Sequence, residues 1–87
     1  MLTDKKGEEA AREIAAWAKT ISSSVDKDLT VDVHDDHPDS NTYLVRLAKD
    51  ARVLLFRLSY GQAHGDGRES ECERTLKRKI KDLANLI

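Results

Sequence analysis

The stretch that most constrains the fold is residues 41–60, NTYLVRLAKDARVLLFRLSY, where two apolar runs flank a polar break at residues 48–51. Runs rich in β-branched, aromatic and aliphatic residues around such a break predict a β-hairpin. The break contains neither Asn-Gly nor Asp-Gly, so the sequence leaves the exact register open. If Lys49 and Asp50 form a two-residue turn, the facing residues are Tyr43 and Phe56, Val45 and Leu54, and Leu47 and Arg52.

Side chains alternate between the two faces of a strand, so one face of this hairpin is expected to be apolar throughout. That face carries Tyr43, Val45, Leu47, Leu54, Phe56 and Leu58. The rest of the chain must therefore supply the elements that cover this apolar face.

The chain is short and nearly neutral. Its 87 residues fit one small domain spanning residues 1–87, which buries roughly 60–65% of the unfolded surface. Hydrophobic residues make up 39% and charged residues 36%, with a net charge of −1. Such a balance gives no overall field toward nucleic acid or a membrane, so any binding of that kind needs a local patch.

Cys72 is the only cysteine, which excludes an internal disulfide and a cysteine-based zinc finger. The chain has no run of about 18 apolar residues and opens with a charged segment rather than a signal-peptide core. We therefore expect a soluble, cytoplasmic protein with no membrane partner.

An amphipathic helix is predicted near each end. From residue 8 to about residue 22, one apolar stripe recurs at helical spacing: Ala10, Ile14, Trp17, Ala18 and Ile21. Thr3 or Asp4 is the expected cap, and the serines at 22–24 the expected end. We interpret Trp17 as a core residue, with a ligand-facing aromatic as the alternative.

The second helix is expected to start near Asp66 or Ser70, because each precedes a glutamate at capping-box spacing. Acidic residues open this helix and basic residues follow, in agreement with its dipole. Its buried stripe is expected to be Cys72, Leu76, Ile80, Leu83 and Ile87.

A half-buried strand is predicted before the hairpin, since Leu29, Val31 and Val33 alternate with polar residues. The resulting order is helix, three strands, helix. The expected fold class is α+β, with a three-stranded antiparallel meander and both helices packed on one face.

This α-β-β-β-α order resembles the double-stranded-RNA-binding-domain topology over nearly the whole chain. In that family, a loop of small residues and histidine joins the first two strands, and a lysine cluster opens the last helix. Here residues 35–39 are Asp-Asp-His-Pro-Asp, and residues 68–73 are Arg-Glu-Ser-Glu-Cys-Glu. The resemblance therefore implies the topology, and fold alone does not imply function.

Two loops offer ligands of different chemistry. The acidic loop supplies oxygen and imidazole groups for a divalent cation from His34, Asp35, Asp36, His37 and Asp39. Its spacing matches no EF-hand, and we favour a solvated loop. Glycines 61, 65 and 67 before Arg68 permit an anion cradle, but nearby acids favour a plain connection. We expect no metal and no cofactor.

Two surfaces are candidates for interaction. On the hairpin's second face, Leu44 opposite Leu55 with Val53 beside them predicts an apolar patch flanked by Arg46 and Arg57. The alternative is that a helix or a terminus covers this face. The last helix presents a basic row suited to phosphates: Arg74, Lys77, Arg78 and Lys81.

No serine or cysteine has a sequence-defined base, and Cys72 lies on a buried stripe, so we predict no catalytic residues and no enzyme. The favoured hypothesis is a protein–protein interaction module that contacts a protein partner or a second copy through Leu44, Val53 and Leu55. Nucleic-acid binding through the basic row is the alternative.

Overall fold

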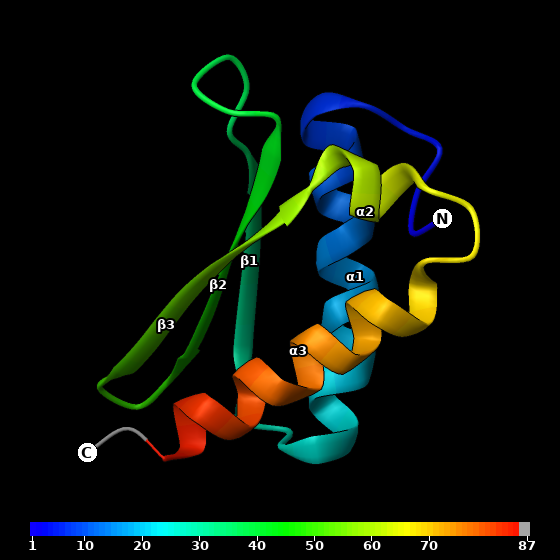
Figure 1. The fold of residues 1–87 in the computed structure, drawn as a ribbon. Helices are drawn as coiled ribbons and strands as arrows, with labels where there is room; N and C mark the ends of the chain where they lie inside the picture. The colour runs from blue at the N-terminus through cyan, green and yellow to red at the C-terminus, as the bar shows by residue number, and fades with distance from the viewer. Residues whose placement is uncertain (86–87) are drawn as a thin grey trace.

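The computed structural model of the chain describes residues 1–85 and has the predicted α+β architecture (Figure 1). A three-stranded antiparallel sheet in the order β1-β2-β3 lies on one side, and the two long helices lie on the other. The elements are α1 (Gly7–Val25), β1 (Thr30–Asp35), β2 (Thr42–Lys49), β3 (Arg52–Ser59), α2 (Tyr60–His64) and α3 (Glu69–Ala84).

The hairpin of β2 and β3 forms as predicted, but its register differs by two residues. The turn falls at Asp50 and Ala51 rather than at Lys49 and Asp50, and Asp50 adopts a positive φ of 55°. Aspartate tolerates this left-handed conformation better than most residues, which explains a tight turn without glycine. The observed pairs are Tyr43 with Leu58, Val45 with Phe56, Leu47 with Leu54, and Lys49 with Arg52.

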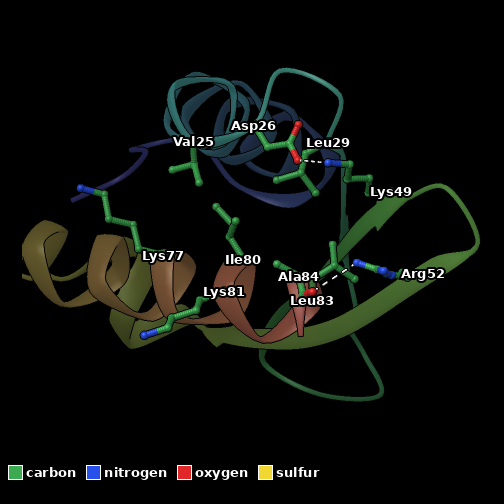
Figure 2. Close-up of a pocket in the computed structure, with 10 residues that line it drawn as sticks. All are labelled: Val25, Asp26, Leu29, Lys49, Arg52, Lys77, Ile80, Lys81, Leu83 and Ala84. Atoms are coloured by element: carbon green, nitrogen blue, oxygen red, sulfur yellow. Dashed lines mark hydrogen bonds and ion pairs between the residues drawn. The ribbon is translucent and has the colours of Figure 1, made fainter. Parts of the chain in front are cut away.

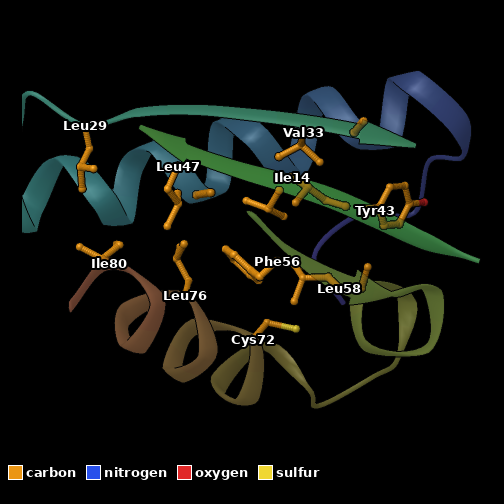
Figure 3. Close-up of a cluster of buried hydrophobic side chains, with 14 of the residues drawn as sticks. Ile14, Leu29, Val33, Tyr43, Leu47, Phe56, Leu58, Cys72, Leu76 and Ile80 are labelled. Carbon is orange, nitrogen blue, oxygen red and sulfur yellow. The ribbon is translucent and has the colours of Figure 1, made fainter. Parts of the chain in front are cut away.

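A shift of two residues preserves the face on which each side chain lies. The predicted inner face is therefore confirmed: five of its members are buried and Leu54 packs against them partly buried. Side chains from both long helices meet this face, as Figure 3 shows for Ile14 of α1 and Leu76 of α3. The core is almost entirely aliphatic, with Tyr43 and Phe56 as its buried aromatics.

Helix α1 has its N-cap later than the predicted Thr3 or Asp4, and it ends later than predicted. Lys6 occupies the N-cap position and contributes no side-chain cap, and the helix continues through the serines to Val25. Thr3, predicted as a cap, is buried, and its hydroxyl donates to Glu13 (2.7 Å). Trp17 is partly buried against the core, which agrees with its predicted role.

The stretch after β3 was predicted as a loop but contains the short helix α2. Ser59 accepts from the backbone N–H of Gln62, whose side chain accepts from the backbone N–H of Ser59, which completes a capping box. Helix α3 starts at Glu69 with Arg68 at the N-cap, so neither predicted cap forms. Its stripe from Cys72 to Leu83 is buried, and Ile87 lies outside the described residues.

Candidate functional site

The outer face of the sheet, which both long helices leave uncovered, carries the first candidate surface. Val53 is 44% exposed and Leu55 is 56% exposed, while Leu44 is half-buried. The predicted contact of Leu44 opposite Leu55 is wrong, because the register places Leu44 opposite Arg57 and Leu55 opposite Arg46. The apolar side chains of this face are therefore interleaved with arginines rather than forming one continuous strip.

Each arginine of the outer face is held by an aspartate of the same chain. Nη1 of Arg46 lies 3.4 Å from Oδ2 of Asp32, which is directly opposite on β1. Nη1 of Arg57 lies 2.6 Å from Oδ2 of Asp36, and the hydrogen bonds from Arg57 and then Ser40 lower the pKa of that carboxyl. These two cations and two anions leave the outer face electrically balanced.

The basic row of α3 is exposed, as expected, but the structure divides it between two hollows. Arg74 and Arg78 line a shallow polar depression together with Glu71 and Thr75. Lys77 and Lys81 line a separate and larger groove. Lys77 is also paired with Glu73, one turn earlier on the helix, at 3.1 Å.

That larger groove, here called the α1–α3 groove, lies where the C-terminal ends of α1 and α3 approach the β2–β3 turn (Figure 2). Its volume is about 460 Å³. The apolar part of its lining consists of Val25, Leu29, Ile80, Leu83 and Ala84. Leu29, Ile80 and Leu83 are buried core residues, so the groove opens directly onto the hydrophobic core.

The charged rim of the α1–α3 groove is strongly basic. Four cations and one acid line it: Lys49, Arg52, Lys77, Lys81 and Asp26. Lys49 is paired with Asp26, and Nη1 of Arg52 donates to the carbonyl of Ala84 (3.2 Å). Within residues 1–85, Lys81 makes no ion pair. Because Lys77 is paired with Glu73 outside the groove, two of the four rim cations, Arg52 and Lys81, make no ion pair within residues 1–85.

A second cavity of about 710 Å³, at the opposite end of the sheet, was not predicted from the sequence. Its wall includes Tyr43, Tyr60 and His64, whose rings lie 4.9 to 5.9 Å apart between centroids. Nδ1 of His64 lies 3.1 Å from the carbonyl of Thr3, which can only accept, so Nδ1 carries the proton. In the neutral imidazole, Nε2 then accepts from the Tyr43 hydroxyl at 2.7 Å.

The tyrosines of this cavity are held in their protonated form. The Tyr60 hydroxyl donates to Asp35, and that bond is the main cause that raises the pKa of Tyr60 to about 12. Burial, with a further contribution from Asp35, raises the pKa of Tyr43. In the described part of the chain every buried side-chain N or O atom has a partner. The cluster therefore holds α2 and the N-terminal segment against the sheet.

Several side chains of the other candidate sites make internal contacts. Asp35, predicted in the acidic loop, instead ends β1 and accepts from Tyr60, while Asp36 accepts from Arg57. Across residues 1–85 no three His, Cys, Asp or Glu side chains converge as metal ligands. Most of the glycine-rich stretch belongs to α2, and Arg68 is bonded to Glu71 (3.0 Å). Cys72 is buried, and burial raises the pKa of its thiol.

No family model, curated protein or solved structure is significantly similar to this chain. None of the helices within residues 1–85 combines the length and apolar character needed to cross a membrane.

Proposed function

We propose that the chain is a non-enzymatic, cytoplasmic protein-interaction module that self-associates through the outer face of its sheet. The observation that carries the proposal is the exposure of Val53 and Leu55, at 44% and 56%, on a face that both long helices leave uncovered. Val53 and Leu55 lie two residues apart on the same face of β3, and neighbouring exposed apolar side chains are typical of protein contact surfaces. The single, buried Cys72 fits a reducing compartment.

The charge balance of the outer face favours a second copy as the partner. Asp32 neutralises Arg46 and Asp36 neutralises Arg57, so a partner with one sign of charge gains little here. A second copy presents the same balanced face. In a two-fold dimer, Asp32 of one copy can approach Arg46 of the other while the apolar side chains meet.

Sedimentation equilibrium over a wide concentration range tests this proposal. We expect the mass to rise from 9.8 kDa toward twice that value as concentration increases. The double variant Val53→Thr/Leu55→Thr places β-branched residues at both strand positions and should remain monomeric. Val25→Thr is the matched control, because Val25 is also 56% exposed but lies at the end of α1.

A wild-type mass of 9.8 kDa at every concentration would refute self-association. Association of the double variant as strong as that of the wild type would refute the outer face as its site. A fall in association for Val25→Thr would instead point to the helical side of the domain.

Nucleic-acid binding through α3 is the second candidate, supported by the exposure of all four predicted cations. It requires an affinity for short double-stranded RNA or DNA that falls steeply with salt. Glu71 and Glu73 lie beside the row and pair with Arg68 and Lys77, which reduces the charge offered to phosphates. For this reason we favour the outer face.

A further inference from the structure

The α1–α3 groove combines two features that the outer face lacks. Its floor is apolar and reaches buried core residues, and its rim holds four cations against one carboxylate. The whole chain, by contrast, has a net charge of −1. Positive charge is thus concentrated around one apolar hollow, where a low-dielectric wall strengthens its effect on an anion.

We propose that the α1–α3 groove binds a small anionic amphiphile, specifically an aliphatic carboxylate with a single unbranched chain. The aliphatic chain of the ligand would lie between Val25 of α1 and Ile80 of α3, which point toward one another across the groove (Figure 2). The carboxylate would lie at the rim, where the ammonium group of Lys81 is exposed and makes no ion pair within residues 1–85.

The C-terminal end of α3 would by itself repel an anion, because helix carbonyls there carry partial negative charge. The C-terminal end of α1 adds a repulsion of the same sign, and the cations of the rim act against both. Arg52, reaching from the β2–β3 hairpin, donates to the carbonyl of Ala84 and places a positive charge on the last turn. A guanidinium has five donors, so this contact leaves others for a carboxylate.

The shape of the groove favours a small ligand over a macromolecule. Its volume of about 460 Å³ falls within the roughly 300–1,000 Å³ typical of small-molecule sites, which are mostly apolar with a few placed polar groups. A nucleic-acid backbone would use the lysines but would leave Val25 and Ile80 without an apolar partner. An unbranched carboxylate uses both parts of the lining.

The test is a titration of the full chain with decanoate, below its micelle concentration, followed by backbone amide shifts in two-dimensional NMR. Using the Val53→Thr/Leu55→Thr variant in parallel separates this site from self-association. We expect shifts that saturate and that are largest at Val25, Leu29 and residues 80–84. Decyltrimethylammonium, with the same chain and the opposite charge, should bind at least tenfold more weakly.

Two exposed residues of α3 provide a matched pair of variants. Lys81→Glu reverses a charge at the groove and should weaken decanoate binding about tenfold. Arg78→Glu makes the same change on the same helix, but beside the polar depression, and should change the affinity less than twofold. Val25→Asn should weaken binding by removing part of the apolar wall, and this change leaves the charge of the rim unaltered.

Equal affinity for the two amphiphiles would overturn the proposal, because the cationic rim would then play no part. Equal effects of Lys81→Glu and Arg78→Glu would overturn it as well, since only general charge would matter. Shifts centred on the outer face, or no saturating shifts, would show that decanoate has no site in the groove. Each of these outcomes leaves the result of the sedimentation experiment unchanged.

Discussion

Replacing Tyr43 with phenylalanine isolates the hydrogen bond at the centre of the unpredicted cavity. The ring stays in place and remains buried at 1% exposure, so apolar burial is almost unchanged. What is lost is the 2.7 Å bond from the Tyr43 hydroxyl to Nε2 of His64. His64 is only half-buried, so water can partly replace the lost donor.

The expected loss follows from these contacts. A typical intramolecular hydrogen bond contributes about 0.5–1.5 kcal/mol, and an acceptor left unpaired adds up to about 1 kcal/mol where water has partial access. We therefore expect Tyr43→Phe to lower the free energy of unfolding by about 1–2 kcal/mol. In a domain of this size, each 1 kcal/mol lowers the Tm by about 4–8 °C.

Urea denaturation followed by circular dichroism and by the fluorescence of Trp17 measures this loss, with an unchanged m value as the sign of an unchanged fold. A double-mutant cycle with His64→Leu should give a coupling energy of about 1 kcal/mol. A free energy of unfolding within about 0.3 kcal/mol of the wild type, or no coupling, would show that water replaces the bond fully and would refute the reasoning.

Two further predictions concern pH. The bond to Asp35 raises the pKa of Tyr60 from 10.0 to about 12, so the stability it contributes is complete below pH 10 and is lost as the pH rises toward 12. Tyr60→Phe should flatten that decline in the free energy of unfolding, as measured by urea titrations at different pH values. An unchanged slope of this free energy against pH would contradict this. Arg57 lowers the pKa of Asp36 below 3.8. The stability that ionised Asp36 contributes is therefore present above pH 3.8 and is lost in more acidic solution. Asp36→Asn should flatten the acid decline, and a parallel decline in both proteins would argue against it.

The inner face of the hairpin could be predicted from the sequence because alternation alone determines it. The register could not be predicted, because the turn depends on Asp50, which adopts a positive φ although it is not a glycine. A shift of two residues leaves the core intact but changes every cross-strand partner. The predicted contact of Leu44 with Leu55 was lost for this reason, although Leu55 is exposed, which was one of the two alternatives left open by the sequence.

Helix α2 had a detectable signal in the sequence. Ser59 and Gln62 have capping-box spacing, but the glycines that follow indicate a loop more strongly. Neither the tyrosine–histidine cavity nor the α1–α3 groove had such a signal in the sequence. The tyrosine–histidine cavity joins Thr3, Tyr43 and His64, and the α1–α3 groove joins both helix ends to the β2–β3 hairpin. Contacts between such distant segments depend on the tertiary fold.

The attachment of the N-terminal segment to α2 has a consequence for the order of folding. The backbone N–H of Leu2 donates to the carbonyl of Ala63 (2.8 Å), and Thr3 accepts from His64. These contacts close a loop of about sixty residues, and closing it early would carry a large entropic cost. The segment can dock only after β3 and α2 have formed. It should therefore be the last part of the domain to become ordered and the first to open in native-state hydrogen exchange.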